Sequence, residues 1–150
     1  MRYIVAGLAA ACLLAGCAVA GKPTAAPVTD EWRQAVFESV AGLGAQLGPV
    51  GSAMVTPDHM TNYTAMRTAC ANLRDYVDSM QHKVLPGPDV KINEALQGGI
   101  DGFRSMADQC MSLTPNNSST RLGKLEATMD RADKQIKDAI SMLNAAVPNG

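Results

Sequence analysis

Three absences limit what this 150-residue chain can do. Its charges are nearly balanced, with 13 Lys and Arg against 14 Asp and Glu, so it lacks the excess of basic residues typical of proteins that bind nucleic acid. The same balance argues against electrostatic attraction as its main means of binding a membrane. There are only two histidines, and no GxSxG, HExxH or P-loop motif. We therefore expect a protein that is not an enzyme and needs no cofactor.

Long hydrophobic runs are also missing, and the longest apolar stretch lies at the N-terminus. Residues 4–14 are almost wholly apolar, but a transmembrane helix needs about 20 such residues. Arg2 precedes this stretch, and the small residues Ala15 and Gly16 follow it. A basic start, a short apolar core and small residues at the end are typical of an export signal.

The end of that signal, Leu14-Ala15-Gly16-Cys17, resembles the lipobox of bacterial prolipoproteins. The resemblance implies that Cys17 receives a lipid and becomes the mature N-terminus, so that residues 1–16 are a signal peptide. Residues 17–29, with small side chains and two prolines, would form a lipidated N-terminus and flexible tether. The expected location is the extracytoplasmic face of the cell membrane. The alternative is an ordinary signal peptide, cut near Ala18 or Ala20.

The cysteines divide by position. Cys12 lies in the signal and Cys17 carries the lipid, which leaves Cys70 and Cys110 as an even pair in an exported chain. Disulfides form and persist in that environment, so we expect these two residues to be bonded to each other. A metal or redox pair is the alternative, but no CxxC spacing supports it.

Four segments carry apolar residues at intervals of three and four, the pattern of amphipathic helices. The first is expected to begin after Thr29, an N-cap residue, and to end at 48–49, a Gly-Pro pair, with a loop over 50–55. The second is expected to begin at 56–58, where Thr-Pro-Asp combines an N-cap with proline at the first helical position, and to stop at Pro86.

The third segment is expected to end at Thr114 and the fourth to run from about Ser119 to Pro148. No stretch alternates apolar and polar residues as a half-buried strand would. The expected fold class is therefore all-α: an antiparallel four-helix bundle over residues 30–147, with one disulfide linking the second and third helices.

That disulfide also predicts where the third helix begins. Cys70 lies roughly 22 Å of helix before Leu85, and Cys110 lies roughly 25 Å after Asn93. The two cysteines meet at one level if the third helix becomes regular near Asn93, whereas a start at Asp89 leaves a mismatch of roughly 9 Å. We therefore expect residues 86–92 to be a connector or an irregular first turn.

Three glycines stand out within the third helix: Gly98, Gly99 and Gly102. Each costs up to about 1 kcal/mol relative to alanine in a helix interior. They could permit the close approach of another backbone, produce a kink, or form a docking surface for a partner protein. A locally weak helix, tolerated because the disulfide holds it, is a further interpretation. The docking surface is the candidate that bears on function.

No metal site is expected. His59 and His82 are 23 positions apart on one predicted helix, more than about 30 Å, so they cannot share a metal within one chain. The methionines are abundant, and thioethers can bind Cu(I), but no tight Met-x-x-Met cluster repeats. Flexible packing of a core, or the lining of an adaptable groove, explains them better.

The domain is also similar to small helical envelope proteins of actinobacteria, secreted or lipid-anchored. The resemblance rests on ACANL at 69–73, LPGPD at 85–89 and ADQC at 107–110, and covers about residues 56–113. It implies a cell-envelope location and an all-α fold, but no particular activity.

The function expected from the sequence is a non-catalytic protein-interaction module that engages another envelope protein. The alternative is a carrier of a lipid or small apolar ligand held between Met-rich helices, and a weaker alternative is the surface exclusion of phage. A continuous apolar cavity would favour the carrier, and a filled core with an exposed apolar patch would favour the interaction module.

Overall fold

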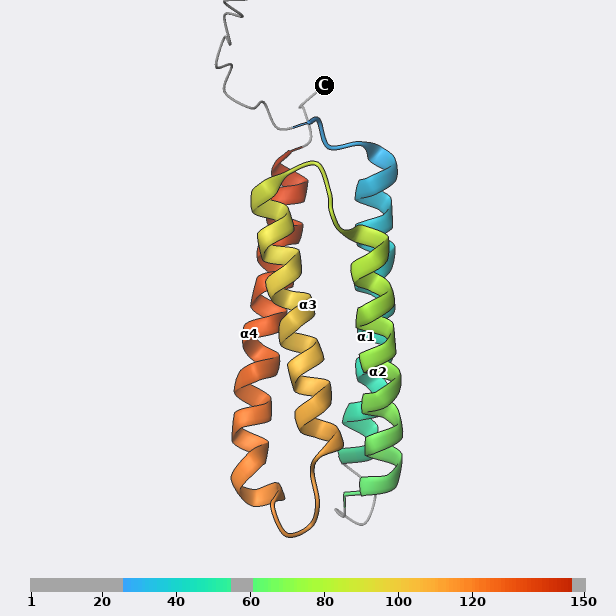
Figure 1. The fold of residues 1–150 in the computed structure, drawn as a ribbon, viewed down its shortest axis with the longest axis vertical. Helices are drawn as coiled ribbons and strands as arrows, with labels where there is room; N and C mark the ends of the chain where they lie inside the picture. Colours follow the sequence, from blue (N-terminus) through green and yellow to red (C-terminus); the bar gives the residue numbers. More distant parts are fainter. Residues whose placement is uncertain (1–25, 55–60, 147–150) are drawn as a thin grey trace, which may run out of the picture.

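The computed structural model describes residues 26–54 and 61–146, which form four long helices. They are α1 (Asp30–Met54), α2 (Tyr63–Val84), α3 (Val90–Met111) and α4 (Ser118–Ala145), and they lie side by side as a bundle (Figure 1). No strand occurs among these residues. The expected all-α bundle of four helices is confirmed. Within the same two ranges, no helix has the length and apolarity that crossing a membrane would require.

Each helix packs on its neighbour in the sequence, and the three resulting seams enclose the core. The contacts have a regular register: the indole of Trp32 at the start of α1 reaches Val84 at the end of α2, while Tyr76 reaches Ser39 further along. The fourth seam is different, because α1 and α4 touch at only a few residues. The largest fully buried side chains come mainly from α2 and α3: Met66, Leu73, Met80, Ile92, Leu96, Ile100, Phe103 and Met106.

Helix α1 does not end at Gly48-Pro49, as the sequence predicts, but continues to Met54. Proline lacks the amide that would bond to the carbonyl four residues earlier, and it normally stops or kinks a helix. Here the apolar stripe resumes beyond it, since Val50 and Ala53 are both buried in the core. Their burial offsets the lost hydrogen bond, so the segment expected to be a loop is helical as far as the structure describes it.

Helix α2 begins at Tyr63, later than predicted. Its N-cap is Asn62, whose side chain accepts a hydrogen bond from the Ala65 amide at 3.0 Å. The Asn62 amide in turn donates to the carbonyl of Ala53 in α1, also at 3.0 Å. The Thr-Pro-Asp start signal at 56–58 lies within residues 55–60, which are outside the described residues.

Helix α3 begins at Val90 and not near Asn93, which corrects the second boundary prediction. Asp89 is the N-cap, and its carboxylate accepts from the Ile92 amide at 2.9 Å. The side chain of Asn93 also clamps the connector, accepting from the Gly87 amide at 2.8 Å and donating to the Gly87 carbonyl at 2.7 Å.

The earlier start of α3 is compatible with the disulfide because the connector between α2 and α3 runs partly along the long axis of the bundle, so the two helix ends lie at different heights. From Cys70 to the end of α2 is about 21 Å of helix, whereas Cys110 lies about 30 Å from the start of α3. The connector over 85–89 takes up the difference: its first and last residues are extended, and Figure 1 shows it rising along the long axis of the bundle before α3 begins. The predicted mismatch of roughly 9 Å is therefore real, and a connector of five residues is long enough to span it.

Candidate functional site

The predicted disulfide between Cys70 and Cys110 is present and joins α2 to α3. The two Cα atoms are 6.1 Å apart, and both residues are fully buried. Met66 on α2 and Met106 on α3, each one helical turn from a cysteine, are buried as well. The bond therefore braces one end of the α2–α3 seam from inside the core, where it has a structural role.

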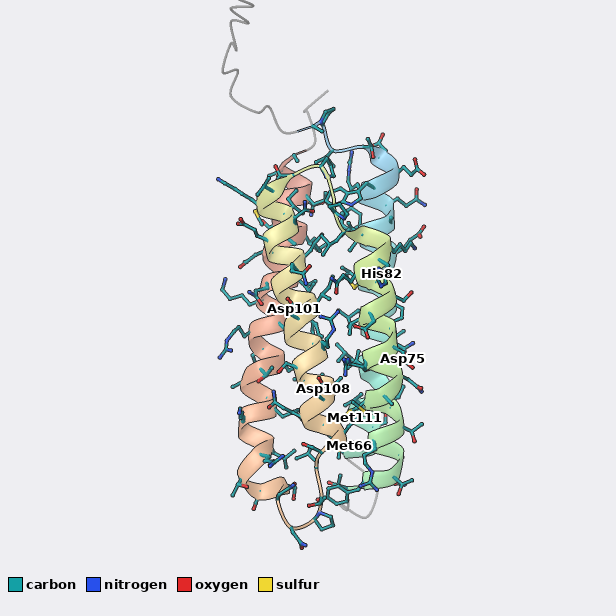
Figure 2. All side chains as sticks on the ribbon, in the orientation of Figure 1. Met66, Asp75, His82, Asp101, Asp108 and Met111 are labelled. Atoms are coloured by element: carbon teal, nitrogen blue, oxygen red, sulfur yellow. A yellow bond between two sulfur atoms is a disulfide. The ribbon has the colours of Figure 1, made fainter. Side chains whose placement is uncertain are left out.

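Ion pairs cross the same seam on the outside of the bundle. Arg104 of α3 donates to Asp78 of α2 at 2.7 Å, and Arg74 of α2 pairs with Asp108 of α3 at 2.5 Å. The Arg104 guanidinium holds the pKa of the Asp78 carboxyl below its ordinary value of 3.8, chiefly through that hydrogen bond. Figure 2 labels Asp108 and Asp101 along α3. These charges are partly exposed, and they reinforce the contact that the disulfide makes inside.

The three glycines of α3 face α4, which corrects the expectation of a docking surface there. A Cβ atom at Gly99 would lie 2.5 Å from the Ile136 side chain, and one at Gly102 would lie 2.7 Å from the Cβ of Ala132. A Cβ at Gly98 would overlap the end of the Gln135 side chain. Close approach of another backbone is therefore the correct interpretation, and the approaching backbone belongs to the same chain.

The other candidate residues are dispersed. His82 is an exposed residue near the end of α2, and His59 lies outside the described residues. Cys17 and residues 18–25 of the predicted tether lie outside them too, whereas residues 26–29 are described and Val28 packs against the core. Among residues 26–54 and 61–146, no three His, Cys, Asp or Glu side chains are grouped so that they could hold a metal ion. Met66, Met80 and Met106 pack in the core, as the sequence predicts for methionine.

An apolar cleft of about 290 Å³ lies where α1 and α4 fail to close on each other. The end of α1 supplies one wall, the beginning of α4 supplies the other, and the fully buried Met106 of α3 lies between them. Its lining residues are Leu47, Val50, Gly51, Met54, Met106, Leu122, Leu125, Glu126 and Met129. Glu126 is the only charged residue among them, and it is exposed.

The chemistry of the cleft follows from this lining. Three methionines and four aliphatic side chains offer an apolar surface that can adjust its shape, because methionine is unbranched and flexible. Small-molecule sites are typically apolar concavities of about 300–1,000 Å³ with few polar groups, so the cleft is at the small end of that range. It can hold an apolar group by burial, but it contains no pair of groups suited to acid–base or nucleophilic chemistry.

A second hollow lies at the other end of the molecule, between the end of α2 and the beginning of α3. It is larger, about 700 Å³, but open to solvent and bordered mainly by polar side chains. These include His82, Glu94, Gln97 and Asp101. A hollow this open to solvent excludes little water, so the smaller apolar cleft is the better candidate site.

Sequence reasoning did not find the cleft. Leu47, Leu122, Leu125 and Met129 stand in the sequence at the spacing of three and four that is typical of the buried face of a helix, and a fully paired bundle would bury them. In the structure Leu122 is instead 40% exposed, and Leu47 and Met129 are only partly buried. No pattern in the sequence distinguishes these positions from core positions, because the difference depends on how closely α1 approaches α4.

The chain was compared with protein-family models, with curated proteins and with solved structures, and none of them matches it.

Proposed function

We propose that this is a lipid-anchored extracytoplasmic protein of the bacterial cell envelope that binds an apolar ligand, without catalysing a reaction. The observation that carries the proposal is the apolar cleft between α1 and α4. The lipobox resemblance at Cys17 supports the anchor and the location, since it combines an export signal with a lipidated cysteine.

Ligand binding replaces the protein-interaction module as the leading function. The module depended on Gly98, Gly99 and Gly102 as a docking surface, and α4 occupies that face. The alternative function, a carrier of an apolar ligand, requires an apolar cavity among methionines, and Met54, Met106 and Met129 line the cleft. The ionisable groups with shifted pKa values, Glu38, Asp78, Arg104 and Lys137, are held by neighbouring ion pairs, and none of them lines the cleft.

The proposal includes an antiparallel arrangement of the bundle. Contacts between α1 and α2 pair early residues of one with late residues of the other, as Trp32 with Val84 and Asn62 with Ala53. The α2–α3 contacts and the contacts of the α3 glycines with α4 follow the same rule. Connections of five to eight residues favour this arrangement, since neighbouring helices joined by short loops run in opposite directions.

Photolabelling tests the binding function in the membrane-anchored protein. Membranes are supplied with a fatty acid that carries a photoreactive diazirine, irradiated, and the labelled peptides are mapped by mass spectrometry. We expect the label on residues 47–54 and 122–129. The variant Gly51→Phe should lose about tenfold or more of this labelling, because a Cβ atom at Gly51 meets no atom within 4 Å and the ring beyond it would occupy the edge of the cleft that Gly51 lines.

Gly44→Phe is the matched control. Gly44 is also exposed, with open space at its Cβ position, and lies two turns before Gly51 on the same face of α1, about 10 Å from it. It does not line the cleft, so its variant should be labelled like the wild type. Equal labelling of the two variants, or a label spread over the whole surface, would contradict the binding function. The anchor has a separate test, since Cys17→Ala should release the protein from membranes.

A further inference from the structure

The lining of the cleft indicates what kind of apolar ligand fits. All of its side chains except that of Glu126 are aliphatic or thioether groups, and the ring of an aromatic residue is absent from it. No hydrogen-bond donor from a side chain lies among these residues to orient a polar group. A ligand buried here is therefore recognised by shape and apolar surface alone, and any polar headgroup must remain outside, on the solvent side of the exposed Glu126.

The volume limits the length of the buried part. An apolar cavity of about 150 Å³ holds one benzene molecule of six carbon atoms, so the cleft holds roughly twelve carbon atoms. That is one unbranched chain of medium length, and it is too little for two chains or for a fused ring system with its substituents.

The proposed anchor brings such chains within reach. The cleft lies at the far end of α1, between about 26 and 36 Å of helix from Asp30. Val28 packs against the core, so the free part of the tether is residues 17–27, which span at most about 37 Å when extended. A bundle on a tether of that length can turn its cleft toward the membrane that holds it, where acyl chains are concentrated.

The glycines in and near the walls of the cleft differ from most other glycines of the bundle in what surrounds their Cβ positions. Nine glycines lie in the described residues, and at five of them a Cβ atom would meet a neighbouring side chain. The remaining four have nothing within 4 Å: Gly44, Gly48, Gly51 and Gly123. Three of these precede or form the α1 wall, and Gly123 lies beside Leu122 in the α4 wall. Packing does not require glycine at any of them.

These glycines lower the local stability of the helices that form the walls, because glycine gains backbone freedom outside a helix. Pro49 adds to the effect in α1, since it cannot donate to the carbonyl of Ala45. Beyond Pro49, α1 has little contact with α4 to hold it in place. Beyond Pro49, the α1 wall is attached to the rest of the bundle through Val50, Ala53 and the partly buried Met54, and through the hydrogen bond from the Asn62 amide to the Ala53 carbonyl.

We infer that the cleft binds a single unbranched acyl chain, and that residues 48–54 of α1 move outward to admit chains longer than the closed cleft can hold. This inference rests on the proposed ligand-binding function and adds the ligand class and the moving wall. The hinge is at Gly48 and Pro49, and the methionines Met54, Met106 and Met129 readjust around the chain.

A series of chain lengths tests the moving wall. Diazirine fatty acids of ten, twelve, sixteen and eighteen carbons are presented to the anchored full-length protein in phosphatidylcholine vesicles, and the fraction labelled in the cleft is measured. The double variant Gly48→Ala/Pro49→Ala restores the missing amide and stiffens α1. It should keep the labelling by the two short chains and lose about tenfold of the labelling by the two long ones, because the open state becomes rarer.

Gly44→Ala controls for a general increase in helix stability, and it should leave the length profile unchanged. Denaturation of the double variant verifies that it is at least as stable as the wild type. A double variant that labels like the wild type at every length, or loses all lengths equally, would overturn the moving wall while leaving ligand binding intact. A wild-type cleft labelled by no chain would overturn the ligand class and the proposed function together.

Discussion

The packing of α3 on α4 makes a quantitative prediction at Gly102. A methyl group added there would lie 2.7 Å from the Cβ of Ala132 and 3.2 Å from its Cα. The second of these neighbours is a backbone atom, so the clash cannot be relieved by turning a side chain. The two helices would have to separate, which opens the packing around them.

The expected cost follows from two opposed effects. Alanine stabilises a helix interior by about 0.5–1 kcal/mol relative to glycine. Overpacking of a well-filled core costs about 1–3 kcal/mol. Gly102→Ala should therefore lower the free energy of unfolding by about 0–2.5 kcal/mol. Gly44→Ala, where a Cβ meets no atom within 4 Å, has only the favourable effect and should raise it by about 0.5–1 kcal/mol.

Urea denaturation of both variants with the disulfide intact measures the difference. The free energies of unfolding should differ by about 1–3 kcal/mol, with the wild type between the two variants or equal to Gly102→Ala. Gly98→Ala should raise the free energy of unfolding nearly as much as Gly44→Ala does, because the atoms that its Cβ would meet belong to the flexible end of the Gln135 side chain. If Gly102→Ala stabilises the protein as much as Gly44→Ala does, the close approach of α3 and α4 is wrong.

Three further predictions concern the two other packed seams. Replacement of Cys70 and Cys110 by alanine opens a loop of 40 residues and should lower stability by about 3–4 kcal/mol in urea denaturation, and alkylation of the unreduced wild type should label neither residue. Trp32→Phe removes the 2.8 Å hydrogen bond from the indole to the Val84 carbonyl at the end of α2, and should cost about 1 kcal/mol or more in the same assay, whereas an unchanged midpoint would show that this contact contributes nothing. The pKa of Asp78 is lowered in the folded protein, so its pairing with Arg104 contributes stability above the unfolded pKa near 4 and loses it as the pH falls through the lower folded value. A pH series of urea midpoints should therefore fall more steeply on acidification for the wild type than for Asp78→Asn, and parallel curves would contradict the ion pair.

Local patterns in the sequence were sufficient for the helices and the disulfide. The stripe of α2 from Met66 to Val84 is buried as predicted, because a 3–4 spacing has only one continuous apolar face. Helix α4 begins and ends within a few residues of its predicted bounds, since no competing signal lies inside it. The Cys70–Cys110 bond could be predicted for another reason: with Cys12 and Cys17 assigned to the expected signal and lipobox, only these two cysteines remain to pair.

Helix boundaries failed where tertiary packing outweighed a local rule. Pro49 is a strong stop signal, yet α1 continues because Val50 and Ala53 find places in the core. The predicted start of α3 is too late because it requires the end of α2 and the start of α3 to lie at the same height along the bundle. The disulfide did constrain the relative height of the two helices, but it could not tell an irregular first turn from a rising connector, since both satisfy the same distance.

The cleft could not be predicted from the sequence, for a more general reason. An amphipathic stripe predicts which side of a helix faces inward, but not how far away the opposite helix lies. Leu122 and Leu47 belong to stripes as regular as those of the core, and they differ only because α1 and α4 do not meet. The glycines were predicted only in part: the sequence places Gly98 and Gly102 inside a helix but Gly48 at a helix end and Gly51 in a loop, whereas all four lie inside helices. The structure separates them by what a Cβ would touch. Gly98 and Gly102 allow α4 to approach, whereas a Cβ at Gly48 or Gly51 would meet nothing within 4 Å. Gly51 lies in the cleft wall and Gly48 lies just before it, and there the freedom of the backbone is the only property left for glycine to supply.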